Sequence, residues 1–245
     1  DVITYSKTFK DHVSHLREVF LRLRAHSVTL KPRKCSFGMN HVKHLGFICS
    51  GKGITSDPAK VKAIADFGKP TSLRQVQSFL GTINWHRETI PNFTELAAPL
   101  YDLQMIKKGE RKPFVWGQEQ QESFEGLKKA VTKQIMLHHP NPHKEFHVDV
   151  DASDIGIGAV LYQLSDEEEK LPIVYVSRAL SEAERKWAAG EKEALAVVWA
   201  LNDKLRPFIA GHKFTLYTDH ANLRYLLRAK KGKLARWGLL IAEFQ

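Results

Sequence analysis

The stretch FHVDVDASDIGIGAVL, from Phe146 to Leu161, decides the predicted fold of the C-terminal half of the chain. Its first six residues alternate between apolar and polar side chains, which is typical of a β-strand with one buried face. Asp149 and Asp151 lie on the polar face, where burial is costly unless a cation neutralises them. Gly156 and Gly158 predict a turn and a returning strand that a bulky group can approach closely.

Two later acids follow elements that can bring them to the same place. Glu193 lies near the start of a helix predicted over residues 191–206, and Asp219 ends a strand predicted over residues 213–218. If that strand is parallel and adjacent to the strand ending at Asp151, the two aspartates meet at one sheet edge. A helix packed on the sheet can then present Glu193 to both of them.

Three converging carboxylates predict a divalent metal site. They would repel one another and raise their pKa values unless a cation lay among them. Two Mg²⁺ ions about 3.5–4 Å apart could activate water and stabilise the leaving oxygen of a phosphodiester. We therefore predict that Asp151, Glu193 and Asp219 are catalytic ligands of Mg²⁺ or Mn²⁺. A solvated hairpin, a solvent-facing helix acid and a helix N-cap would explain the same three acids singly.

The charge balance of the 245 residues favours a polyanionic partner. The formal net charge is +10, from 37 Lys and Arg against 27 Asp and Glu. Nucleic acid is the first candidate and an anionic membrane surface the second, and no apolar run is long enough to span a membrane. A solvated basic face is the alternative interpretation. The candidate phosphate-binding residues are Lys31, Arg33, Lys34, Lys52 and Arg87.

Composition also bounds the class of protein. Hydrophobic residues make up 43% of the chain, so we expect a packed core and no disorder. Cys35 and Cys49 form neither a disulfide framework nor a zinc site, which favours a reduced, intracellular protein. The first residues contain no Met and no signal-peptide pattern, so we expect the chain to be cut from something longer.

The N-terminal half is predicted to be mainly helical. A strand over residues 2–6 precedes a helix that Ser6 or Thr8 caps and that runs to about Ala25. A single strand over residues 42–49 then leads through a glycine turn into a second short strand. Four further helices are predicted to begin at Asp57-Pro58, at Thr71 or Ser72, near Thr94 and at Gln118.

A linker at Pro140-Asn141-Pro142 separates this half from the predicted sheet. Beyond it the predicted order is strand, strand, strand, helix, strand. Two more helices follow, over about residues 221–228 and 234–244.

Several short motifs stand in order along the whole chain. In the first half they are Asp1-Val-Ile-Thr-Tyr-Ser-Lys-Thr-Phe, His44-Leu-Gly-Phe-Ile, Phe79-Leu-Gly, Ile90-Pro-Asn-Phe and Ala98-Pro-Leu-Tyr-Asp-Leu. In the second half they are Asp151-Ala-Ser-Asp, Tyr175-Val-Ser-Arg-Ala-Leu-Ser, Glu191-Lys-Glu-Ala-Leu-Ala-Val-Val and Thr218-Asp-His. With these motifs the chain resembles the Pol polyprotein of gypsy-type long-terminal-repeat retrotransposons over essentially its whole length.

The resemblance implies an α+β fold in three parts. Residues 1–57 resemble a remnant of the reverse-transcriptase palm with a hairpin like the primer grip. Residues 58–136 resemble the helical thumb and connection, and residues 137–245 resemble an RNase H domain built on a mixed α/β sheet. The resemblance also implies that Asp151, Glu193 and Asp219 are RNase H metal ligands, and that the partner is an RNA–DNA hybrid. The implied location is cytoplasmic, in a particle, or nuclear.

Three departures from the family limit the implied activity. Asp1 matches only the second Asp of the family's Tyr-x-Asp-Asp motif, so we expect no polymerase site in this chain. The sequence stops at Gln245, before the family's last RNase H strand, helix and fourth Asp, so we expect an exposed sheet edge and weaker metal binding. Glu88 adds a negative charge to a thumb stretch that is more basic in the family.

The resulting expectation is a reverse transcriptase/RNase H fragment that binds RNA–DNA hybrid and hydrolyses its RNA strand, weakened by truncation. The alternative is a non-catalytic nucleic-acid- or protein-binding module derived from a retroelement. A transcribed relic without function is a third interpretation.

Overall fold

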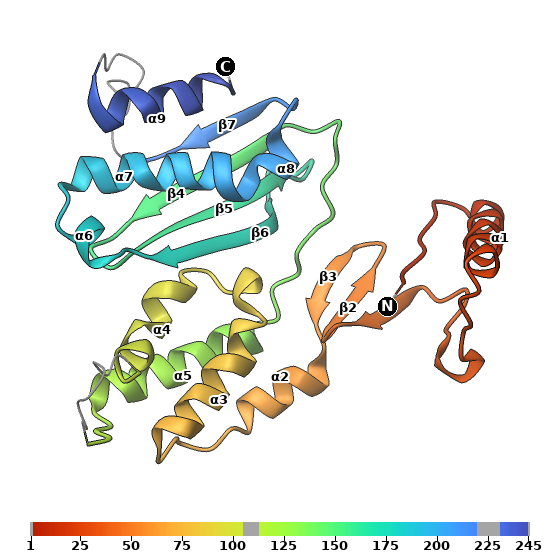
Figure 1. The fold of residues 1–245 in the computed structure, drawn as a ribbon, viewed down its shortest axis with the longest axis horizontal. Helices are drawn as coiled ribbons and strands as arrows, with labels where there is room; N and C mark the ends of the chain where they lie inside the picture. The colour runs from red at the N-terminus through yellow and green to blue at the C-terminus, as the bar shows by residue number, and fades with distance from the viewer. Residues whose placement is uncertain (1, 105–112, 220–230, 245) are drawn as a thin grey trace.

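The computed structural model describes residues 2–104, 113–219 and 231–244, and it confirms the α+β class (Figure 1). A helix and a small sheet come first, a group of packed helices follows, and a larger mixed sheet with its own helices completes the chain. Two separate hydrophobic cores occur in the described residues, one among the packed helices and one under the larger sheet.

The first helix, α1 (Phe9–Ala25), begins where the sequence predicts. The hydroxyl of Thr8 accepts a hydrogen bond from the backbone N–H of Asp11, as expected of an N-cap. No residue of α1 is buried, and its apolar residues Val13, Phe20 and Leu21 are exposed. The strand predicted over residues 2–6 is wrong, because these residues form no strand ladder.

The small sheet has three antiparallel strands, β1 (His41–His44), β2 (Phe47–Ser50) and β3 (Gly53–Ser56). The single strand predicted over residues 42–49 is therefore wrong, since a tight turn divides it. Leu45 and Gly46 at this turn have φ values of 48° and 83°. The left-handed backbone reverses the chain, and the indole N–H of Trp85 donates to the Leu45 carbonyl oxygen at 2.5 Å.

The packed helices are α2 (Pro58–Ala65), α3 (Leu73–Asn84), α4 (Phe93–Asp102) and α5 (Gln118–Thr132), with a 3₁₀ turn η2 (Arg87–Thr89). Asp57 caps α2 and Ser72 caps α3, as predicted. Their apolar stripes meet in one core that includes Ile64, Val76, Phe79, Leu80, Ile83, Phe93, Leu100, Phe124, Leu127 and Val131.

The larger sheet has the order β6-β5-β4-β7, with β4 (Phe146–Ala152), β5 (Gly156–Leu164), β6 (Lys170–Ala179) and β7 (Phe214–Tyr217). The pairs β4–β5 and β5–β6 are antiparallel, whereas β4 and β7 are parallel neighbours. This arrangement confirms the predicted adjacency of the first and fourth strands. Phe146, Val148 and Val150 on β4 are buried in the core beneath the sheet.

The helices of this half are the short α6 (Glu182–Arg185), then α7 (Ala189–Val198), α8 (Arg206–Ile209) and α9 (Gly232–Ala242). Helix α7 lies across the larger sheet (Figure 1). The helix predicted over residues 191–206 is not regular throughout, since a π-helical segment η3 (Trp199–Leu205) separates α7 from α8. Pro207 has no N–H for the carbonyl of Asp203, so the α-helical ladder cannot continue there. The helix predicted over residues 221–228 lies outside the described residues.

None of the helices in the described ranges is long and apolar enough to cross a bilayer.

Candidate functional site

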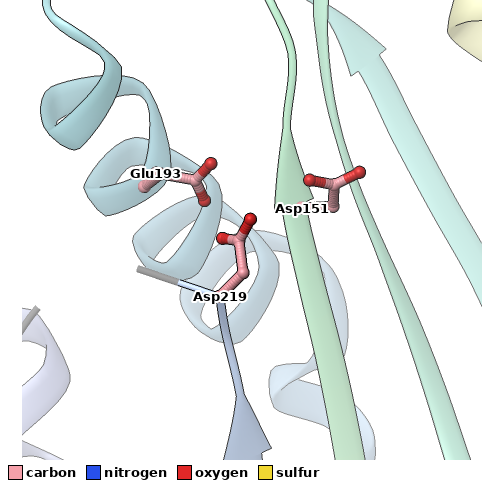
Figure 2. Close-up of side chains that lie close together, drawn as sticks. All are labelled: Asp151, Glu193 and Asp219. Atoms are coloured by element: carbon pink, nitrogen blue, oxygen red, sulfur yellow. The ribbon is translucent and has the colours of Figure 1, made fainter. Parts of the chain in front are cut away.

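Three carboxylates from three separate elements meet beside the larger sheet (Figure 2). Asp151 lies near the end of β4, Glu193 lies on α7, and Asp219 follows β7. One oxygen from each carboxylate can be chosen so that all three lie within 4.8 Å of one another. The structure therefore brings together the three predicted site residues, which are 26 to 68 positions apart in sequence.

The parallel strand register explains why the two aspartates coincide. Asp149 pairs with Tyr217 in the β4–β7 ladder, so Asp151 and Asp219 each lie two residues beyond the same pair. Side chains two residues apart along a strand point to the same face, which places both carboxylates at one level of the sheet edge. Glu193 reaches them from α7, and the backbone N–H of Ala152 donates a hydrogen bond to it.

Glu193 is the buried member of the cluster, whereas both aspartates are exposed. Glu193 is only 6% exposed. Its burial, together with the charges of Asp219 and Asp151, raises the pKa of its carboxyl to about 7. Its Oε2 atom is buried and finds no hydrogen-bond partner among the described residues. A buried, unpaired carboxylate oxygen is costly, so the site favours a cation at this point.

The donor set fits a hard divalent cation. Carboxylate oxygens are the ligands that Mg²⁺ and Mn²⁺ prefer, and Mg²⁺ binds them at about 2.1 Å, so two ligands of one ion lie up to about 4.2 Å apart. The three carboxylate oxygens lie within 4.8 Å of one another, so their separations exceed that span by at most about 0.6 Å. A pair of ions would bridge a wider set. Asp151, Glu193 and Asp219 are the residues that would hold the metal.

Lys192 is a site neighbour that the sequence did not single out. It is only 6% exposed, and its ammonium group donates to Asp154 at 2.6 Å. This ion pair ties α7 to the turn between β4 and β5, and Lys192 holds the pKa of Asp154 below its usual value. The available signal was a lysine between Glu191 and Glu193, in the first turns of a helix whose later residues are apolar.

The structure separates the five basic residues proposed to bind phosphate. Lys31, Arg33 and Lys34 are exposed at the 3₁₀ turn η1 (Pro32–Lys34), and Lys52 is exposed in the β2–β3 turn. Arg87 differs, because its guanidinium donates to the carbonyl oxygen of Ser177 at 2.6 Å and lies over the Phe93 ring. That guanidinium makes an internal contact, and its binding of phosphate stays a prediction.

Comparison with known proteins agrees with this geometry. Residues 141–244 match the family described as an RNase H-like domain found in reverse transcriptase. The whole chain is 34% identical to the Retrovirus-related Pol polyprotein from transposon 297 and 35% identical to that from transposon opus, both of Drosophila melanogaster. It covers 22% and 25% of these two relatives. The transposon gypsy Pol polyprotein is 35% identical over 97% of this chain, which covers 23% of it.

Solved structures show the same fold. The foamy viral protease-reverse transcriptase in complex with RNA/DNA hybrid matches with a TM-score of 0.76 and 23% identity, over 98% of this chain and 33% of that one. Its dRH form in complex with ds DNA also gives 0.76, with 24% identity, over 97% of this chain and 42% of that one. Over its whole length the chain is thus similar to part of gypsy-type retrotransposon Pol polyproteins, and residues 141–244 match the RNase H-like domain found in reverse transcriptase.

Proposed function

We propose that the carboxylate cluster is a divalent-metal site that hydrolyses the RNA strand of an RNA–DNA hybrid. The observation that carries the proposal is the meeting of Asp151, Glu193 and Asp219 within 4.8 Å, in a domain of the RNase H-like family. Among the described residues no second acid cluster of metal-binding size occurs. We therefore assign nuclease chemistry to this cluster.

The three acids have different proposed roles because they differ in exposure to solvent. Asp151 and Asp219 are exposed, so they face solvent on the side from which a phosphodiester can approach. Glu193 is buried and would supply a negative charge to the cation from the protein side. Mg²⁺ or Mn²⁺, when bound, supplies an activated water and stabilises the leaving oxygen. The protein's own contribution is to fix three oxygen ligands on a rigid sheet edge and helix.

The proposed partner is a hybrid held through its backbone. The net charge of +10 and the exposed Lys31, Arg33, Lys34 and Lys52 support binding to phosphates. A hybrid differs from duplex DNA in its groove shape and in its 2′-hydroxyl groups, which allow the RNA strand to be recognised. The foamy viral protease-reverse transcriptase, solved in complex with RNA/DNA hybrid, has this fold.

Hybrid cleavage in Mg²⁺ and in Mn²⁺ tests the proposal with a matched pair of variants. Asp151→Asn removes one carboxylate of the cluster, and we expect it to lower the cleavage rate by at least ~100-fold, in line with the loss of an essential electrostatic group. Asp149→Asn is the control, because Asp149 lies two residues earlier on the same strand, where it pairs with Lys170 instead. Equal cleavage by the wild type and by Asp151→Asn would exclude the catalytic role.

A non-catalytic hybrid-binding module is the second candidate. The basic charge and the exposed lysines favour binding whether or not chemistry follows. Hybrid binding that survives in Asp151→Asn, with no cleavage by the wild type at any metal concentration, would support this candidate.

A further inference from the structure

The helical core contacts the larger sheet near the C-terminal end of β6 and the adjacent start of β5. Arg87 of η2 donates through Nη2 to the backbone carbonyl oxygen of Ser177 at 2.6 Å. Thr94 of α4 donates its hydroxyl to the Ser177 hydroxyl at 2.9 Å. The partners are 90 and 83 residues apart in sequence, so these two bonds hold together parts of the chain that fold around different cores.

The contact is closely fitted on both sides. Thr94 is only 8% exposed, and its methyl group faces Gly156 on β5. A Cβ at Gly156 would lie 3.0 Å from Cγ2 of Thr94 and 3.2 Å from the carbonyl oxygen of Arg178, closer than ordinary packing allows. The absence of a side chain at Gly156 therefore lets α4 approach the sheet.

Ser177 lies in the same cross-strand row as the metal site. Asp151 pairs with Gly158 in the β4–β5 ladder, and Gly158 pairs with Ser177 in the β5–β6 ladder. Neighbouring strands are about 4.8 Å apart, so the contact point is about 10 Å from Asp151 along that row. The row crosses rigid, hydrogen-bonded backbone, so a displacement of α4 relative to Ser177 is a displacement relative to the carboxylates.

We propose that Arg87 and Thr94 are positioning residues: they dock the helical half on Ser177, so that a hybrid held by the N-terminal half meets the carboxylate cluster at a defined place along its RNA strand. This inference rests on the proposed function of the cluster. It assigns to Arg87 a structural contact with the sheet in place of a direct contact with phosphate.

A distance measurement tests the docking without nucleic acid or metal. Nitroxide labels at Glu125→Cys on α5 and Lys186→Cys after α6, both exposed positions, report the separation of the two halves after Cys35 and Cys49 are replaced by Ser. We expect one narrow distance distribution for the wild type. Thr94→Val with Arg87→Met removes both donors and keeps the apolar contacts. Each lost bond should lower the ratio of docked to undocked molecules by about fivefold, which broadens the distribution.

Three further variants separate the hydrogen bonds from general damage. Thr94→Ser keeps the hydroxyl and should retain the narrow distribution. Gly156→Ala places a methyl group against Thr94 from the sheet side, which should push α4 away and broaden the distance distribution. This variant gives a test even if the double variant fails to fold. Thr82→Val is the matched control, because the Thr82 hydroxyl bonds only within its own helix at an exposed site. A double variant as narrow as the wild type would overturn the proposal.

A cleavage assay supplies the second readout. With end-labelled RNA in a hybrid, we expect the wild type to cut at a restricted set of positions and the double variant to cut over a wider set. An unchanged cleavage pattern despite a broadened distance distribution would overturn the positioning role. If the wild type cleaves nothing, the proposed function fails, whereas the distance distributions still decide whether Arg87 and Thr94 dock the two halves.

Discussion

At the scale of single residues, the buried carboxylate of Glu193 lowers the stability of the metal-free protein but supplies a ligand to the proposed metal site. Burial raises the pKa of its carboxyl from an ordinary value of 4.5 to about 7 in the folded protein. Between these values the unfolded chain releases the proton first, so the stability that this group contributes is lost as the pH rises from 4.5 to 7. A cation in the cluster would reverse this penalty.

We predict that Glu193→Gln stabilises the metal-free protein by about 1–2 kcal/mol at pH 8, because the variant buries no charge. Chemical denaturation in EDTA measures this difference. In Mg²⁺ the wild type should gain stability by mass action, whereas the variant should gain little. A variant that is less stable than the wild type in EDTA would contradict the account of a strained, unpaired carboxylate.

Glu184 shows the opposite behaviour. Both of its carboxylate oxygens accept hydrogen bonds from Arg178, at 2.9 and 3.0 Å, and the backbone N–H of Ser181 donates a third. The backbone N–H of Glu184 donates in turn to the Ser181 hydroxyl. The Arg178 guanidinium is the main reason that the pKa of Glu184 falls to about 2. Because this pKa is depressed, the stabilisation is present above pH 4.5 and is lost as the pH falls towards 2.

Glu184→Gln is therefore expected to cost roughly 2–3 kcal/mol at pH 7, since the pair is largely shielded from solvent. The difference between variant and wild type should shrink steadily as the pH is lowered from about 5 to about 2. Glu182→Gln, at an exposed position in the same short helix, is the control. Urea denaturation at several pH values measures both, and a pH-independent difference would argue against the ion pair.

At the scale of elements, the small sheet is tied to the linker segment, which we take here as the residues between α5 and β4, that leads into the larger sheet. Ile54 and Leu137 exchange two backbone hydrogen bonds, of 2.8 and 2.9 Å, and His138 donates its N–H to the carbonyl of Pro172 at 2.7 Å. The linker thus contacts β3 on one side and β6 on the other. Gly53 at the start of β3 has a φ of 153° and lies against the Leu137 carbonyl.

We predict that Gly53→Ala destabilises the protein by about 2 kcal/mol or more, because a methyl group would collide with the Leu137 carbonyl oxygen. Gly51→Ala in the same turn is the matched control, since its methyl would enter open space. Denaturation in urea compares them. Equal losses from both variants would mean that the β2–β3 turn itself, and not its contact with the linker, sets the cost.

At the scale of the whole molecule, the charge excess should govern hybrid binding. Each phosphate contact releases counterions, so the logarithm of the binding constant should fall linearly with the logarithm of the salt concentration. Lys31→Gln with Lys34→Gln should flatten that slope by about 1–2, as expected for two lost contacts. Lys129→Gln with Lys133→Gln, two exposed lysines at the end of α5, removes the same charge elsewhere. Equal slopes for the two double variants would remove the η1 region from the interface.

Local sequence patterns determined most of the elements. Capping residues and apolar spacing placed the starts of α1, α2 and α3, and the alternation around Asp151 placed β4 and its hairpin. Local patterns failed where the backbone needed tertiary support. The turn at Leu45 uses left-handed backbone at a leucine, which Trp85 stabilises from 40 residues away. The π-helical segment η3 was likewise not predicted, because the apolar spacing of the sequence is typical of one continuous helix up to Arg206.

By itself the sequence determined the acids of the site, their elements and the family, because strand alternation and ordered motifs are local properties that burial and chemistry impose. Only the tertiary structure decided that Asp151 and Asp219 share one register level, that Glu193 is buried with an unpaired oxygen, and that Arg87 contacts Ser177. These features depend on strand register and on packing between distant segments. The free energies that set them come from contacts that no short stretch of sequence contains.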